Sequence, residues 1–271
     1  MFELLLIAIG LIGSFAAGFY DLKTSNIPDK LCILMIISGL MIHLLYGFST
    51  GDFNTLTNSL IFGGIFLAFG LLMYFTGQWG GGDGELLVAI GILLPQVSII
   101  KTYFPFALSF FINSFFIGAA YSILYSLILS YRSPKISENF FKSLKQPLLL
   151  IPLSIFLMLS IVSFFYFKYI SFIFFLVFIM ILFWKFAKTI EQGFYKKIPV
   201  SKLKVDDMLG EDIPRLKIYK RLIKGLTKDE IKKIKKIKKY VIVREGIRYG
   251  LVFPLALIFT LLFGDIFFLL L

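Results

Sequence analysis

Two aspartates lie at the borders of long apolar stretches, where their side chains could do chemistry together. Asp21 follows the uncharged stretch Leu4–Tyr20. Asp83 lies just before the uncharged stretch Leu86–Ile100, and acidic side chains so close to hydrocarbon usually serve a function. Two carboxyl groups that converge can share one proton, so that one activates water as a general base while the other polarises a carbonyl. Asp21 and Asp83 are therefore the candidate catalytic residues, and amide hydrolysis is the chemistry that they favour.

The helix ends predict a division of roles between the two carboxyl groups. Asp83 would lie at the N-terminus of a helix, where the helix dipole stabilises negative charge. Asp21 would lie at a C-terminus, where the dipole disfavours it. We expect Asp83 to be the carboxylate and Asp21 the acid of the resting pair, with a titration that belongs to both groups.

The segment before Asp83 is rich in glycine. Five of the ten residues from Thr76 to Glu85 are glycines, namely Gly77, Gly80, Gly81, Gly82 and Gly84. Glycine lets a backbone approach another chain closely and adopt positive φ, so an extended substrate could lie against the carboxylate. A flexible loop is the plainer alternative. A phosphate cradle is not supported, because the segment has neither a P-loop pattern nor a basic residue.

The composition requires a membrane to hold these residues. Hydrophobic residues make up 58% of the 271 and charged residues 16%, against about 25% in soluble domains. A single cysteine and a single histidine exclude an intrachain disulfide and disfavour a histidine-based triad; we expect neither a metal nor a cofactor. Eight uncharged stretches predict about eight transmembrane helices. They are 4–20, 31–51, 53–82, 86–100, 102–131, 146–167, 169–184 and 249–264.

The basic residues predict the orientation of these helices. With eight spans, 26 of the 28 Lys and Arg fall on one side, and only Lys101 and Lys168 on the other. The rich side is cytoplasmic by the positive-inside rule. A multi-pass protein of the cell membrane is therefore predicted, with both aspartates at the cytoplasmic side and both termini outside.

A small basic segment, 187–247, is predicted to form a cytoplasmic α+β domain. Strands are expected at 196–202, 216–219 and 240–243, and a helix after Thr227, with Glu230 completing a capping box. From 187 to 248 there are 19 basic and 8 acidic residues, a net charge of +11. This surface is expected either to be merely solvated or to bind anionic lipid headgroups. Nucleic acid is not an expected partner, because no reading motif accompanies the charge.

Two motifs resemble those of type IV prepilin peptidases, and most closely the archaeal preflagellin and prepilin peptidases. Gly80–Asp83 is a GxGD motif at the start of a membrane helix. The stretch from Asp21 to Ile27-Pro28-Asp29 resembles the family's Asp-x5-Ile-Pro-(Asn/Asp) pattern. The resemblance covers about Met1 to Arg132, roughly half of the chain.

The resemblance implies a membrane aspartic endopeptidase with Asp21 and Asp83 as its catalytic residues. Its substrates would be archaellin or type IV pilin-like precursors, from which it would remove short class III leader peptides at the cytoplasmic face. Many bacterial relatives have Lys where this chain has Glu85, so Glu85 could tune the pair or contact substrate, or simply complement the helix dipole. Asp29 could bind substrate, or be solvated or cap the next helix.

The resemblance also gives expectations for domains. The family core commonly has six helices, so Gln146–Trp184 would be an extra hairpin. The expected parts are a catalytic membrane core at 1–131, a cytoplasmic loop at 132–147, an additional hairpin at 148–186, the basic domain at 187–247 and a last helix at 248–271.

Two other functions remain open from the sequence. A presenilin-like protease would use the same aspartates but cut within a membrane helix of its substrate. An ion- or proton-coupled transporter would use them as ligands, although it would favour broken helices near the membrane midplane and an internal repeat.

Overall fold

The computed structural model describes residues 2–132, 134–205, 207–216, 218–219, 225–244 and 246–266. These residues form two compact units, which are considered separately. The first contains the described residues of Met1–Ser122 and Gly246–Leu271. The second contains those of Ile123–Arg221 and Gly225–Glu245.

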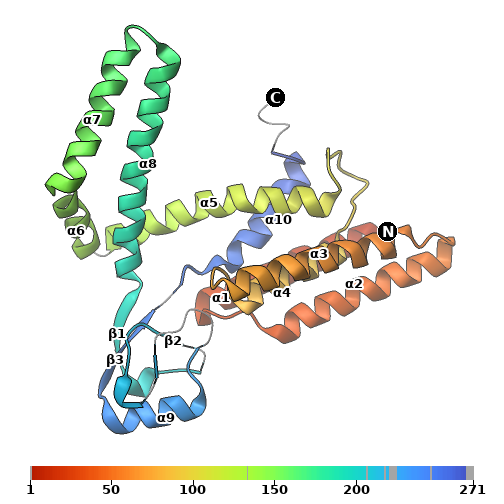
Figure 1. The fold of residues 1–271 in the computed structure, drawn as a ribbon. Helices are drawn as coiled ribbons and strands as arrows, with labels where there is room; N and C mark the ends of the chain where they lie inside the picture. The colour runs from red at the N-terminus through yellow and green to blue at the C-terminus, as the bar shows by residue number, and fades with distance from the viewer. Residues whose placement is uncertain are drawn as a thin grey trace. The chain divides into compact units, whose positions relative to one another are not determined.

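The first unit is helical. Its elements are α1 (Phe2–Thr24), α2 (Asp29–Thr50), α3 (Asn54–Phe75), α4 (Gly81–Leu93), the first part of α5 (Phe106–Arg132), the short 3-10 helix η3 (Tyr249–Leu251) and α10 (Val252–Phe263). In Figure 1, α1, α2 and α3 run beside α4, and each of them contacts it.

The short helix α4 is the centre of this unit. Its residues from Leu86 to Leu93 are all buried, as expected for a helix that is apolar on every side. Glycines let its neighbours approach: a Cβ on Gly70 of α3 would lie 3.0 Å from the Cα of Gly84. At the other end of α4, His43 Nε2 donates to the carbonyl oxygen of Ile92, at 3.1 Å. His43 is thus a hydrogen-bonded packing residue.

Six described helices are long and apolar enough to cross a membrane, which confirms a polytopic helical membrane protein. They are Phe2–Thr24, Asp29–Thr50, Asn54–Phe75, Phe106–Tyr131, Pro147–Phe164 and Ile173–Glu191. The two remaining predicted spans are shorter. The helix α4 has 13 residues and rises about 20 Å. It is short because Pro95 disfavours a helical conformation at Leu94, so the helix ends at Leu93. The other is the apolar helix Tyr249–Phe263.

The second unit contains a helical hairpin. It is built from α6 (Pro134–Leu144), α7 (Pro147–Phe164) and α8 (Lys168–Gly193). Ser160 of α7 and Ser171 of α8 hydrogen-bond each other's carbonyl oxygens, at 3.1 and 2.8 Å. The helix α6 occupies most of the segment expected to be a loop, and α8 continues beyond the expected end of the hairpin to Gly193.

A small α+β fold completes the second unit. The strands β1 (Tyr195–Pro199), β2 (Met208–Leu209) and β3 (Tyr240–Arg244) form an antiparallel sheet in the order β1-β3-β2. The helix α9 (Lys228–Ile237) buries Ile231 and Ile234 in the same core as the sheet.

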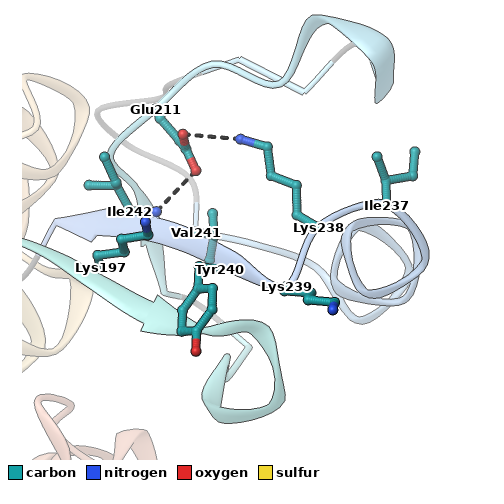
Figure 2. A pocket seen from close by; sticks show the side chains of 8 residues that line it. All are labelled: Lys197, Glu211, Ile237, Lys238, Lys239, Tyr240, Val241 and Ile242. Atoms are coloured by element: carbon teal, nitrogen blue, oxygen red, sulfur yellow. Dashed lines mark hydrogen bonds and ion pairs between the residues drawn. The ribbon is translucent and has the colours of Figure 1, made fainter.

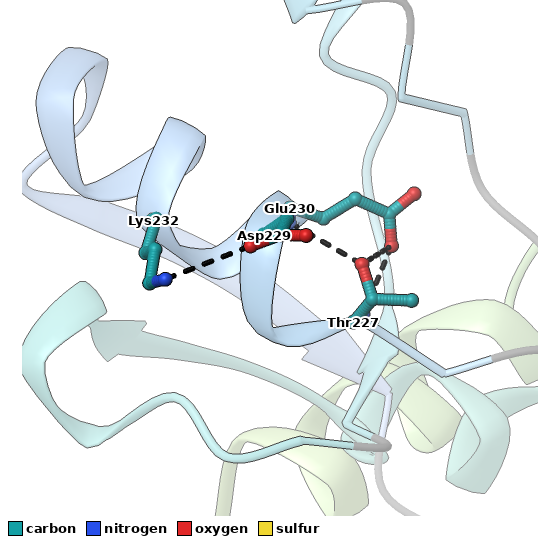
Figure 3. Close-up of polar contacts among 4 residues, drawn as sticks. All are labelled: Thr227, Asp229, Glu230 and Lys232. Carbon is teal, nitrogen blue, oxygen red and sulfur yellow. Dashed lines mark hydrogen bonds and ion pairs between the residues drawn. The ribbon is translucent and has the colours of Figure 1, made fainter.

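The predicted helix start at Thr227 is confirmed. The Glu230 carboxylate accepts the Thr227 N–H at 2.9 Å, and the Thr227 hydroxyl accepts the Glu230 N–H at 3.3 Å, as Figure 3 shows. This is the reciprocal pattern of a capping box, and it gives a hydrogen-bond acceptor to two backbone N–H groups at the helix start.

The expected strand at 216–219 is wrong for its described residues. Leu216 ends a 3-10 turn, and Ile218 makes only an isolated bridge with Ile213. Pro214 opens that turn with its fixed φ, which favours a tight turn over an extended strand. Lys217 lies outside the described residues. The two-residue β2 was not predicted, because it is too short to show an alternating pattern.

Candidate active site

Asp21 lies in the last turn of α1 with its side chain directed into the first unit. The residue is 7% exposed. The helix ends soon after it, where Ser25 adopts a left-handed φ of 59° and donates its N–H to the Asp21 carbonyl oxygen at 2.7 Å. This ending turns the chain toward Ile27 and the start of α2.

Asp83 lies in the first turn of α4. Gly80 is the N-cap, and its N–H donates to Asp83 Oδ2 at 3.2 Å. The carboxylate therefore reaches back to the helix start, where unpaired N–H groups and the helix dipole favour negative charge. The sequence expectation that Asp83 begins a helix is correct.

The structure brings Asp21 and Asp83 close enough for their charges to interact. One reason is the packing of the α1–α2 connection on the start of α4. A Cβ on Gly82 would lie only 2.7 Å from the Cβ of Ile27, so this approach requires a glycine. The two carboxyl groups thus come from different helices and lie within range of electrostatic interaction, as paired-carboxylate chemistry requires.

The four motif glycines have different surroundings. Gly82 and Gly84 pack against other backbone or side-chain atoms, and a Cβ on Gly84 would lie 3.2 Å from the Cα of Gly70. Gly80 and Gly81 are exposed, and a Cβ on Gly81 would first meet Tyr74 at 3.9 Å. A Cβ on Gly80 would lie 3.3 Å from Asp83 Oδ2, so the missing side chain at this exposed position keeps the space beside the carboxylate free.

Two further acidic residues lie near the pair. Glu85 is half-buried, and its Oε2 atom is buried without a hydrogen-bond partner among the described residues. Asp29 is exposed in the first turn of α2, where Pro28 is the N-cap, and its charge interacts with that of Glu85. No group of three or more His, Cys, Asp and Glu lies together in the described part of the chain, so that part offers no metal-ligating set.

Sequence reasoning missed a third contributor, the segment 248–250 before α10. The Gly250 N–H donates to Asp21 Oδ2 at 2.9 Å. The Arg248 guanidinium donates to the Leu22 carbonyl oxygen, and its charge interacts with Asp21. The Tyr249 ring lies 5.9 Å from the Trp79 ring, and its hydroxyl is within electrostatic range of Asp83. The one signal in the sequence is a glycine at the start of an apolar stretch, more than 200 residues from Asp21.

Another buried aspartate lies elsewhere in this unit. Asp265 is 1% exposed, follows α10 and accepts a hydrogen bond from the Tyr103 N–H in the segment before α5. It therefore joins two chain segments and is not part of the Asp21–Asp83 pair.

Comparison with known proteins places this geometry in context. Residues 8–123 match the type IV leader peptidase family. The chain is 35% identical over 91 residues to a preflagellin peptidase of Methanococcus voltae, which covers 33% of the chain and 38% of the relative. It is 29% identical over 145 residues to a preflagellin peptidase of Methanococcus maripaludis, and this match covers 49% of the chain and 63% of the relative. It is 28% identical over 157 residues to prepilin peptidase EppA of Methanothermobacter thermautotrophicus, covering 53% and 41%. The chain thus matches less than two thirds of each of these relatives.

Proposed function

We propose that this chain, whose residues 8–123 match the type IV leader peptidase family, is a membrane aspartic endopeptidase of the GxGD type. It removes short class III leader peptides from archaellin or type IV pilin-like precursors at the cytoplasmic face of the membrane. Names of the matched relatives, preflagellin peptidase and prepilin peptidase, support this class of substrate.

The observation that carries the proposal is the packing of the α1–α2 connection on the start of α4, where Ile27 lies against Gly82 and the charges of Asp21 and Asp83 interact. In the proposed reaction one carboxylate removes a proton from water as the oxygen attacks the scissile carbonyl. The other carboxyl group, protonated, donates a hydrogen bond to that carbonyl oxygen. The proton is then passed to the leaving nitrogen when the C–N bond breaks, so the pair returns to its starting state.

The glycines and the nearby acids have separate proposed roles. Gly80 and Gly81 let an extended leader lie against Asp83, whereas Gly82 and Gly84 keep the helices close. Glu85 and Asp29 contact substrate or tune the pair. The lone buried oxygen of Glu85 supports this role, because an unpaired buried acceptor favours binding a donor.

The proposed topology has eight spans, with both termini outside and the 187–247 domain in the cytoplasm. The helices α4 and α10 are short, but both are largely buried among their neighbours and need not match the full hydrocarbon thickness themselves. Single cysteines in place of Lys101 and Lys235, in a Cys32→Ser background, test this. An impermeant thiol reagent added to intact cells should label the first and not the second; the reverse result contradicts the orientation.

The basic domain is proposed to bind anionic lipid headgroups. Exposed lysines follow the outer face of α9, namely Lys228, Lys232, Lys233, Lys235 and Lys236. Figure 2 shows further lysines around a pocket of about 470 Å³, where Lys238 pairs with Glu211 at 3.1 Å. Basic residues near an anionic surface contribute about 1 kcal/mol each.

The lipid proposal is tested with the full chain in vesicles. A fluorophore on a Lys236→Cys variant, in a Cys32→Ser background, should be quenched by lipid-borne quenchers in phosphatidylglycerol vesicles. The quenching should be weaker in phosphatidylcholine and at high salt. Equal quenching under all three conditions would mean that the lysines are merely solvated.

Mapping the cut is the decisive test of the peptidase activity. Purified full-length chain is incubated with an archaellin or pilin precursor, and the products are identified by mass spectrometry. We expect a single cut before the apolar stretch of the precursor. A cut within that stretch would instead indicate intramembrane proteolysis. If several precursors remained uncut, the peptidase proposal would be contradicted. Proton-coupled flux would then be measured to test the transporter alternative.

A further inference from the structure

The 3-10 helix η3 brings a backbone donor to the candidate site from a distant part of the chain. The Gly250 N–H lies 2.9 Å from Asp21 Oδ2, and both residues are buried. Residue 250 lies outside the part of the chain that matches the family. A hydrogen bond from a buried amide to a carboxyl group is stronger than one between neutral groups, because the acceptor can carry charge.

This contact depends on glycine at two positions. A Cβ on Gly250 would lie 2.8 Å from the Asp21 Cβ and 3.0 Å from its Oδ2. A Cβ on Gly18, one turn earlier in α1, would lie 3.0 Å from the Gly250 carbonyl oxygen and 2.8 Å from Leu251 Cδ2. Any larger side chain at either position would push η3 away from α1.

Contacts of the two preceding residues, Arg248 and Tyr249, hold the turn at Gly250. Before it, the Arg248 guanidinium donates to the Leu22 carbonyl oxygen, and the Tyr121 hydroxyl donates to the Arg248 carbonyl oxygen at 2.9 Å. The Tyr249 ring packs 5.9 Å from Trp79, which directly precedes the glycines of the Asp83 turn. The segment 248–250 therefore contacts the elements that carry both aspartates.

We propose that the Gly250 amide is a positioning group of the active site, and this rests on the proposed peptidase function. By occupying Oδ2 of Asp21, the amide fixes the rotation of the carboxyl group. The other oxygen, Oδ1, is left to hold the proton or to face water and the scissile carbonyl. The two aspartates thus receive matching backbone support, from Gly250 for Asp21 and from Gly80 for Asp83.

Replacing Gly250 with glycolic acid, by nonsense suppression in the full chain, tests the hydrogen bond alone. This change converts the amide to an ester, so the donor is lost while no atom is added beside Asp21. We expect kcat for precursor cleavage to fall about tenfold or more, KM to change little and the pH profile of kcat to move. The thermal midpoint in detergent should fall only slightly, because Arg248 and Tyr249 keep their contacts with α1 and Trp79.

Gly250→Ala provides a second variant, with Gly246→Ala as its matched control. Gly246 is exposed and a Cβ there would meet nothing within 4 Å, so cleavage should stay at the wild-type rate. Gly250→Ala should lose more activity than the ester, because it also moves the turn. An ester variant with unchanged kcat and pH profile overturns the positioning role. Absence of cleavage by the wild type would instead mean that the proposed function is wrong.

Discussion

The two ends of α4 differ in the hydrogen bonding and the exposure of their polar groups. At the C-terminal end, the Ile92 carbonyl oxygen accepts hydrogen bonds from His43 at 3.1 Å and from Ser59 at 2.7 Å, all inside the bundle. At the N-terminal end, Gly80 and Gly81 are exposed beside the Asp83 carboxylate. One end is closed by satisfied structural contacts, whereas the other places two exposed glycines next to a carboxylate.

This difference separates residues that hold the fold from residues that could act on a substrate. Buried polar groups with complete partners mainly stabilise a structure. A carboxylate that shares its location with a second one, and lies beside glycines open to solvent, is better suited to chemistry. The contrast predicts that changes at the two ends have different consequences, and the predictions below run from the largest effect to the smallest.

Lengthening either aspartate should cause the largest loss. Asp21→Glu and Asp83→Glu keep the charge but move the carboxyl group by one methylene, and a displacement of about 1 Å can cost on the order of a hundredfold in rate. Initial rates of precursor cleavage measure the effect. A thermal midpoint measured in detergent on the same samples separates a loss of geometry from a loss of folded protein, because an extra methylene at a buried site can also lower stability. A rate within about threefold of the wild type would contradict the requirement for this geometry.

Adding a methyl group at Gly82 should cause the next largest effect. Gly82→Ala places a Cβ 2.7 Å from that of Ile27, so the connection that follows Asp21 must shift. Overpacking costs about 1–3 kcal/mol, and we expect cleavage to fall about tenfold together with the thermal midpoint. Gly64→Ala is the matched control, because a Cβ at this exposed helical position meets nothing within 4 Å. Equal cleavage rates and thermal midpoints in the two variants would show that the close approach of Gly82 to Ile27 is not needed for activity or stability.

At the closed end of α4, a substitution should affect stability and leave chemistry intact. His43→Leu removes the donor to the Ile92 carbonyl oxygen and should cost about 1–3 kcal/mol. Thermal unfolding in detergent should show a lower midpoint, with kcat per folded molecule unchanged. A selective loss of kcat at full stability would mean that this end also takes part in the reaction.

Glu85→Gln should have the smallest effect. The amide keeps the shape of the side chain but replaces the charge beside Asp29. If Glu85 contacts a donor on the leader, KM should rise a few-fold while kcat stays nearly constant. Steady-state cleavage over a range of precursor concentrations separates the two constants. An unchanged KM would leave Glu85 the role of an acid that complements the helix dipole.

Local patterns in the sequence predicted those features that depend on neighbouring residues. Asp83 does start a helix, and the capping box at Thr227 forms, because both signals lie within one helical turn. The length of α4 could not be predicted from the uncharged stretch, because that stretch continues beyond Leu93, where the helix ends just before Pro95. The Gly250–Asp21 contact could not be predicted, because the two residues are brought together by the packing of η3 on α1 and not by any pattern along the chain.

The most direct measurement compares precursor cleavage by Asp21→Asn, Asp83→Asn and Asp52→Asn variants. Asp52 is an exposed aspartate in the connection between α2 and α3, outside the candidate site, and serves as the control. If the pair activates water, the first two variants should lose cleavage while remaining folded, and the third should cleave at the wild-type rate. Cleavage that survives the loss of either Asp21 or Asp83 would contradict a shared catalytic role for the two carboxyl groups.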